Sequence, residues 1–125
     1  MDFKSKHPIY LQIAEQICGE ILRGAYPEGG RLPSVREYAA LVEVNVNTLV
    51  RSYDWLSQQS IIFNRRGLGY FVAEGATEHI MQIRRSEFLD EWLPELVQRM
   101  RTLGISVEEV ERRIDELERE NKDNV

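Results

Sequence analysis

The spacing of apolar residues predicts a first helix followed by an irregular loop. Apolar positions recur at helical spacing from Pro8 to about Arg23, and proline suits an opening turn because it has no amide hydrogen to leave unpaired. A glycine then predicts the end of this helix. Residues 25–30 are rich in turn-forming types, and Leu32 before Pro33 predicts a short extended piece, since proline disfavours helix in the residue before it.

Two helices separated by a tight turn are predicted next. Ser34 and Glu37 have the spacing of a capping box, which predicts a helix from Ser34 to about Val42. Asn45 is a good N-cap for a second helix that runs to about Gln59. The second helix has a core-facing side formed by Leu49, Tyr53 and Leu56. Its opposite side is polar and is formed by Asn47, Arg51, Asp54 and Gln58.

A β-hairpin completes this part of the chain. Residues 61–63 and 70–72 are β-branched or aromatic, which predicts two strands joined by a turn around Arg66 and Gly67. Asn64, Arg65 and Arg66 are predicted at or near the tip of this wing. Residues 32–71 therefore predict a winged helix-turn-helix, in which the second helix (about 45–59) enters the major groove of DNA and the wing (about 62–72) lies alongside.

The remainder of the chain, from Ala76, is helical by pattern. Pro94 interrupts the pattern and predicts either a kinked long helix or two consecutive helices. Gly104 predicts an end, and Ser106 with Glu109 predicts a second capping box that opens a final helix. The apolar residues of the earlier stretch are Ile80, Ile83, Leu89, Trp92, Leu93, Leu96, Val97, Met100 and Leu103. The stripe of the final helix is Val107, Val110, Ile114 and Leu117.

The apolar faces of these last helices predict a dimer. A pair of helices of this size buries little apolar surface by folding on itself, and most soluble oligomers are symmetric homo-oligomers. We therefore expect a mainly α protein with a small hairpin, divided into a DNA-binding domain (1–75) and a helical dimerisation tail (76–125). The residues predicted at the dimer interface are Leu89, Trp92, Leu93, Leu96, Val97, Met100, Val110, Ile114 and Leu117. A drug or cofactor pocket around Trp92 is the alternative interpretation.

Composition narrows the possible classes of protein. The chain has 125 residues, 42% of them hydrophobic, which indicates a folded protein. It lacks an apolar run long enough to span a membrane, and residues 1–6 lack the apolar core of a signal peptide, so we expect a cytoplasmic protein without a membrane partner. With only His7 and His79, it lacks the residues for a structural metal site, and no catalytic constellation stands out. We expect no enzymatic activity, no metal and no cofactor.

The lone cysteine and the charge distribution need separate interpretation. Cys18 lies among apolar positions of the first helix, which favours a buried, inert thiol over a redox sensor. The net charge of −5 first argues against a nucleic-acid binder, which neutralises phosphates with Lys and Arg. Residues 1–75, however, carry eight basic and eight acidic residues, whereas residues 76–125 carry eight and thirteen. The acid excess therefore belongs to the tail.

The residues of the first helix, the helix-turn-helix and the wing together resemble the GntR family of bacterial winged-helix transcription regulators, and within it the YtrA-like subfamily. Residues 8–13 are similar to the family's opening helix, and residues 34–37 match its Ser-x-Arg-Glu helix start. Residues 44–53 are similar to the subfamily's recognition-helix signature, and residues 65–72 to its wing. The resemblance implies a homodimeric regulator of transcription, a repressor, that binds an inverted-repeat operator in double-stranded DNA.

The resemblance also implies which residues contact DNA. The carried-over contacts are Arg36, Asn45, Val46, Asn47, Thr48, Arg66 and Gly67. Arg31 and Arg51 are added as cations that flank the same surface, and Arg65 because a basic pair beside a glycine turn suits backbone or minor-groove contact. The simpler alternatives are a solvated or ion-paired Arg36, an Asn47 that serves only the helix start, and ordinary hairpin charges at 65 and 66.

The sequence departs from the family pattern at two positions, and it does not identify a small-molecule effector. Val46 stands where the subfamily usually has Pro and other relatives often have Arg, and Val50 stands where some relatives have a contacting Arg. We hypothesise that Val46 contacts a thymine methyl group. Residues 76–125 have no room for the ligand-sensing domain of larger relatives, so any small-molecule effector is unknown. The alternatives to a specific regulator are a protein-association module and a non-specific DNA architectural protein.

Overall fold

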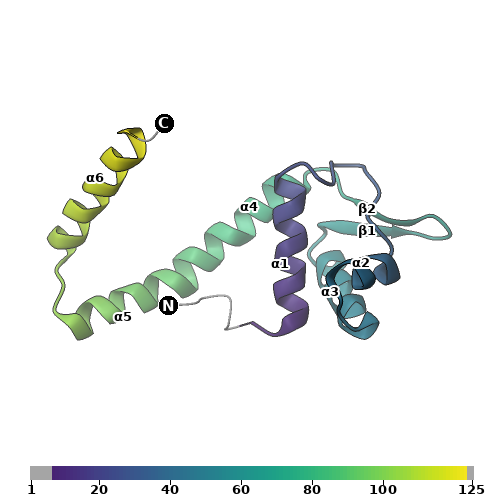
Figure 1. Cartoon of the computed structure of the whole chain (residues 1–125), viewed down its shortest axis with the longest axis horizontal. Coiled ribbons are helices and arrows are strands. Elements are labelled where there is room, and N and C mark those ends of the chain that lie inside the picture. Colours follow the sequence, from purple (N-terminus) through teal and green to yellow (C-terminus); the bar gives the residue numbers. More distant parts are fainter. Residues whose placement is uncertain (1–6, 124–125) are drawn as a thin grey trace. The chain divides into compact units, whose positions relative to one another are not determined.

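The computed structural model describes residues 7–123 (Figure 1), and the chain divides between Arg85 and Ser86 into two compact units. The described chain is mostly helical and contains one two-stranded antiparallel hairpin, as the sequence predicts. The first unit contains α1 (Ile9–Leu22), α2 (Val35–Val42), α3 (Val46–Gln58), β1 (Ile62–Arg65), β2 (Gly69–Val72) and most of α4 (Ala76–Glu87). The second contains η2 (Phe88–Trp92), α5 (Leu93–Leu103) and α6 (Val107–Asp123).

Local capping chemistry sets the boundaries of α2 and α3. The Ser34 hydroxyl accepts a hydrogen bond from the Glu37 amide at 3.1 Å, and the Glu37 carboxylate accepts one from the Ser34 amide at 3.3 Å. This is the predicted capping box. The side-chain oxygen of Asn45 accepts a hydrogen bond from the Asn47 amide at 2.7 Å and caps α3. Both predicted helix starts are therefore confirmed.

The wing is wider than the two predicted strands because the loop after α1 pairs with it. β1 and β2 are antiparallel, with Phe63 opposite Phe71. Arg31 forms an isolated bridge with Phe71, and the Leu32 amide donates to the Tyr70 carbonyl at 2.9 Å. β1 begins one residue later than predicted, at Ile62, since the amide of the preceding residue returns to the last turn of α3. The wing thus shares backbone hydrogen bonds with the segment that leads into α2.

The core of the first unit is apolar, and its buried polar atoms have partners. Tyr53 is fully buried, and its hydroxyl donates to the Pro33 carbonyl at 2.6 Å. The Tyr38 hydroxyl donates to the Glu20 carboxylate at 2.7 Å. Among the described residues, no buried side-chain nitrogen or oxygen lacks a hydrogen bond. The fully or nearly fully buried apolar residues include Ile17, Leu32, Leu49, Leu56, Ile61, Ile62, Val72, Ala76 and Ile80.

Cys18 lies in this core, as predicted. Its side chain is 5% exposed. Desolvation by burial raises the pKa of the thiol to about 12, against a smaller opposing effect of the Arg84 charge. The thiol therefore stays protonated at neutral pH, which fits an inert core residue.

The second unit is held together differently, because none of the described residues in η2, α5 or α6 is buried. The residues before Pro94 form a π-helical stretch, in which the Leu93 amide donates to the Phe88 carbonyl five residues back. Pro94 then lies in the first turn of α5, where its missing amide hydrogen costs little. Gly104 ends α5 in the left-handed conformation, and the Ser106 hydroxyl accepts a hydrogen bond from the Glu109 amide at the start of α6. No helix within residues 7–123 is long and apolar enough to cross a membrane.

Candidate nucleic-acid interface

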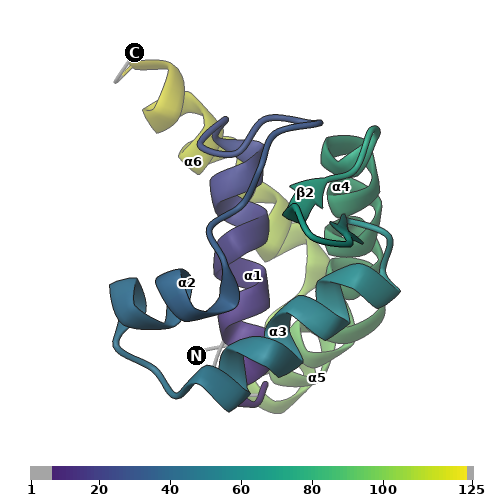
Figure 2. The same cartoon turned by 90° about the vertical axis from the view of Figure 1, so that its right-hand side faces the viewer.

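Three elements of the first unit form one candidate surface. Figure 2 shows α2, α3 and the β1–β2 wing on the side that faces the viewer, with α1 behind them. In Figure 1 the same elements lie at the right of the picture. The predicted DNA contacts in residues 31–67 come from these elements and from the loops that join them. The fold thus brings the elements that carry the sequence-predicted residues together in one compact unit.

The leading turn of α3 is open to a ligand. Asn47 is exposed, and among the described residues its side-chain amide has no hydrogen-bond partner. Asn45 is also exposed, but its side-chain oxygen is occupied by the cap. Val46 is 38% exposed and Val50, one turn later, is 42% exposed, whereas Thr48 is half-buried. The surface offered by this turn is therefore an amide beside two apolar side chains.

Five arginines at the candidate surface carry charges that no nearby carboxylate neutralises. They are exposed, and within residues 7–123 none of them forms an ion pair. An arginine without a carboxylate partner keeps its donors available to a phosphate. The prediction that these residues contact DNA gains support from this, but the contacts themselves stay predictions. The five are Arg31, Arg36, Arg51, Arg65 and Arg66.

Two of these arginines lie against the wing, one beside two aromatic rings and the other beside a glycine. The Phe63 and Phe71 rings are stacked with centroids 5.9 Å apart. The Arg65 guanidinium carbon lies 5.7 Å from the first centroid and 5.5 Å from the second. Arg31 crosses the backbone at Gly69, where an added Cβ would lie 3.2 Å from its Nε atom. Sequence reasoning missed this role of Gly69, whose φ of +114° also excludes most side chains.

The turn between the strands supplies the other two predicted wing residues. Arg66 and Gly67 are both exposed, and Gly67 has a φ of +80°, which favours glycine. The Leu68 amide donates to the Arg65 carbonyl at 2.9 Å and closes the turn. The predicted tip residues therefore lie at a tight turn, with Leu68 58% exposed beside them.

α3 is attached to α1 by two contacts that the sequence did not predict. The Arg51 guanidinium carbon lies 4.2 Å from the centroid of the Tyr10 ring. The hydroxyl of Ser52, which is fully buried, donates to the Tyr10 carbonyl at 2.6 Å. These residues are about forty positions apart in the sequence, so no local pattern relates them.

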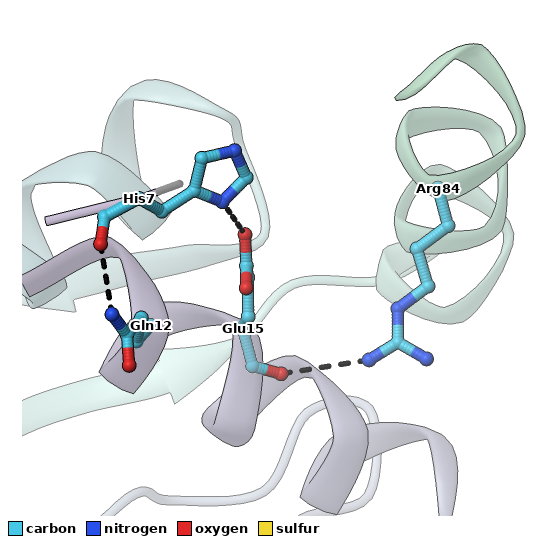
Figure 3. A network of polar contacts seen from close by, with 4 residues as sticks. All are labelled: His7, Gln12, Glu15 and Arg84. Atoms are coloured by element: carbon cyan, nitrogen blue, oxygen red, sulfur yellow. Dashed lines mark hydrogen bonds and ion pairs between the residues drawn. The ribbon is translucent and has the colours of Figure 1, made fainter. Parts of the chain in front are cut away.

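A separate polar network surrounds the first half of α1 (Figure 3). The His7 Nδ1 atom and the Glu15 carboxylate are 2.5 Å apart, and the Gln12 amide donates to the His7 carbonyl at 2.8 Å. Arg84 from α4 reaches the Glu15 carbonyl at 3.5 Å. Because these groups use one another as partners, the network explains how α1 begins and how α4 is tied to it.

Comparisons with known proteins agree with this geometry. Residues 9–72 match the family described as bacterial regulatory proteins, gntR family. The HTH-type transcriptional regulator YhcF of Bacillus subtilis is 41% identical over 86% of this chain and 88% of its own length. The HTH-type transcriptional repressor YtrA of the same species is 32% identical over 94% and 89% of the two chains. These relatives are transcriptional regulators rather than enzymes.

Solved structures lead to the same family. A crystal structure of a GntR-family transcriptional regulator from Bacteroides thetaiotaomicron superposes with a TM-score of 0.81 at 48% identity. The match covers 90% of this chain and 98% of that one, so it includes the helices after the wing as well as the helix-turn-helix. The predicted resemblance is confirmed: the chain belongs to the gntR family of bacterial regulatory proteins, with a winged helix-turn-helix followed by a helical region.

Proposed function

We propose that this transcriptional regulator is a homodimeric repressor that recognises an inverted-repeat operator. The recognition helix α3 inserts its leading turn into the major groove, and the wing lies against the neighbouring backbone or minor groove. The observation that carries the proposal is the set of five exposed arginines without ion pairs around the open start of α3. Such a protein acts in the cytoplasm, uses no cofactor and has no enzymatic activity.

Sequence readout is assigned to the leading turn of α3. The Asn47 amide donates and accepts hydrogen bonds together, which suits the major-groove edge of adenine. Val46 presents an exposed apolar side chain that suits a thymine methyl group. The arginines of α2 and of the wing contact the phosphate backbone and set the position of α3, without carrying sequence information themselves.

The dimer is assigned to the part of the tail in the second unit, because none of the described residues in η2, α5 or α6 is buried. Leu93, Leu96 and Val97 on α5 are 36–39% exposed, and Ile114 and Leu117 on α6 are 46–47% exposed. Apolar surface in such amounts is stabilised by burial against a partner, and a second copy offers the same surface by symmetry. Two copies place two recognition helices in half-sites separated by about one turn of DNA or a multiple of it.

Repression follows from occupancy of an operator. A bound dimer blocks a promoter that overlaps its site, without a catalytic step. The similarity to the repressor YtrA extends over 94% of this chain and supports this direction of control. Residues 1–75 then act as the DNA-binding part and residues 76–125 as the dimerisation part, and no effector is assigned.

Binding to selected DNA over a salt series tests the proposal. A duplex is selected from a random pool by repeated binding to the purified protein, and its dissociation constant is compared with that of a scrambled duplex. We expect an inverted repeat and at least a thousandfold preference for it, which is the lower end for specific regulators. Equal binding to both duplexes would indicate an architectural protein, and no binding to either would indicate a protein-association module.

A matched pair of substitutions tests the assigned readout. Asn47→Ala removes the amide from the leading turn, whereas Gln58→Ala removes an exposed amide from the last turn of the same helix. We expect Asn47→Ala to lose about 1–3 kcal/mol of discrimination at one base pair in each half-site. Gln58→Ala keeps the full preference. Loss of preference in both variants would count against readout by the leading turn.

A further inference from the structure

Tyr10 on α1 contacts Arg51, a solvent-exposed residue of the recognition helix α3. The Arg51 guanidinium carbon lies 4.2 Å from the centroid of the Tyr10 ring, which is within the range of a cation–π contact. Arg51 is exposed, and among the described residues it has no ion pair. The ring is therefore the group against which this otherwise free cation rests.

The backbone of Tyr10 is fixed to the same turn of α3. The Ser52 hydroxyl donates to the Tyr10 carbonyl at 2.6 Å and also contacts the Thr48 carbonyl at 3.1 Å. Ser52 is fully buried, so this contact is shielded from water. The ring and the arginine are thus held at a defined distance by a buried hydrogen bond between α1 and α3.

Arg51 also occupies the correct part of the helix to act beside the readout residues. It follows Asn47 by four residues, which places both on the exposed side of α3 about one turn apart. The first residues of a recognition helix contact the base edges, so we place Arg51, one turn behind them, at the phosphates of the groove edge. A free arginine loses rotamer freedom when it binds a phosphate, and a side chain already held against a ring loses less.

We propose that Tyr10 is a positioning residue for DNA binding, which holds the Arg51 guanidinium ready for a phosphate at the edge of the major groove. The inference rests on the proposed function, because it requires that α3 binds DNA. It assigns to α1, which lies outside the helix-turn-helix itself, an influence on affinity that acts through Arg51. The partner is the DNA backbone, so the influence is on strength of binding and is independent of base sequence.

A double-mutant cycle on the selected duplex tests this inference. The four proteins are wild type, Tyr10→Leu, Arg51→Ala and the double variant. We expect Tyr10→Leu to weaken binding about twofold to fivefold, because Arg51 must then be ordered on binding, and this range lies within the cost of immobilising one long side chain. We expect it to have no further effect when Arg51 is already alanine. Equal weakening in both backgrounds, or no weakening in wild type, overturns the inference.

Two conservative variants separate positioning from a purely structural effect. Tyr10→Phe keeps the ring and is expected to bind as wild type. Arg51→Lys keeps the charge but loses the planar group that stacks, and we expect binding weaker than wild type. Arg51→Lys provides a readout even where Tyr10→Leu fails to fold. Wild-type affinity of Arg51→Lys counts against the inference.

The salt dependence gives a second readout. Arg51→Ala is expected to reduce the slope of log affinity against log salt by about one for each half-site contacted. An unchanged slope overturns the phosphate contact. The proposed function fails on a different result, namely when the wild-type protein shows no preference for its selected duplex. The inference about Tyr10 fails when wild type keeps this preference and the double-mutant cycle shows no coupling.

Discussion

The two compact units use their apolar residues in opposite ways. In the first, side chains such as Leu49, Tyr53 and Ile61 are fully buried. In the second, none of the described residues is buried, and Leu89 and Leu103 are 51% and 70% exposed. The first unit therefore obtains its folding energy within one chain, whereas the second has apolar surface that becomes stabilising only when something covers it.

Their arginines differ in a corresponding way. The five arginines around α2, α3 and the wing form no ion pair within residues 7–123. In the second unit, Arg99 pairs with Glu95 at 3.4 Å, and Arg113 pairs with Glu116 at 2.9 Å. Pairs at these spacings support a helix by a few tenths of a kcal/mol, roughly 0.2–0.5 each. Within the described part of the chain, the cations of the candidate surface thus have no carboxylate partner, whereas two arginines of the second unit have one.

The largest expected effect is on the free energy of unfolding, and it distinguishes a buried apolar residue of the first unit from a half-exposed one of the second. Leu49→Ala empties a fully buried site in the first unit, so we expect the free energy of unfolding to fall by about 2–5 kcal/mol. Leu117→Ala shortens a half-exposed side chain, and we expect mainly a weaker dimer. Urea denaturation followed by circular dichroism measures the first effect, and sedimentation equilibrium measures the second. The comparison fails if Leu49→Ala leaves the free energy of unfolding unchanged.

The next effect concerns association. Leu96→Glu places a charge on the apolar face of α5, and we expect a monomer whose operator affinity falls on the order of a hundredfold, because the two half-sites are no longer bound together. Gln98→Glu adds the same charge at an exposed position two residues away and is expected to remain a dimer. Light scattering and DNA titration measure both properties. A dimeric Leu96→Glu protein with full affinity would remove α5 from the interface.

Local chemistry made the helix boundaries predictable from the sequence. Ser34 with Glu37 and Asn45 each cap a helix start, because the groups that they satisfy lie within three residues. Gly104 ends α5 for an equally local reason, its positive φ. The α-helical core stripe of α3 was predictable because its periodicity fixes which residues share a face.

Contacts between distant segments were not predictable in the same way. The pairing of Arg31 with Phe71 and the contact of Tyr10 with Arg51 join segments about forty residues apart, which no periodic pattern relates. The π-helical stretch before Pro94 was also missed, since the proline predicted a kink or a break and left open how the backbone adjusts. The predicted DNA-contacting residues followed from family resemblance, whereas their freedom from ion pairs required the fold.

A smaller effect tests the contrast between the arginines. Arg36→Ala removes an unpaired cation from α2, and we expect about a tenfold loss of operator affinity with a shallower salt dependence. Arg113→Ala removes a cation that α6 pairs with Glu116, and we expect operator affinity within twofold of wild type. Fluorescence anisotropy at several salt concentrations measures both. Equal losses in the two variants would mean that overall charge, rather than position, decides binding.

The smallest expected effect is a pH dependence confined to the first unit. The Glu28 carboxylate accepts a hydrogen bond from the Gly75 amide at 2.5 Å, at the start of α4. This bond, with a contribution from Thr77, lowers the pKa of Glu28 below its ordinary value of 4.5. The folded state therefore favours the ionised form. Its stabilising contribution is present above pH 4.5 and is lost as the pH falls through the lower pKa of the folded state.

Glu28→Gln should therefore lower the melting temperature slightly at neutral pH, and the difference from wild type should shrink as the pH falls below 4.5. Calorimetry between neutral and acid pH measures this difference. Glu111→Gln, on α6, removes the same charge without removing this hydrogen bond, and is expected to leave the melting temperature of the first unit unchanged. If the difference for Glu28→Gln stayed constant at acid pH, its cause would be a contact that does not depend on ionisation, and the bond to the Gly75 amide would not link the stability of this unit to pH.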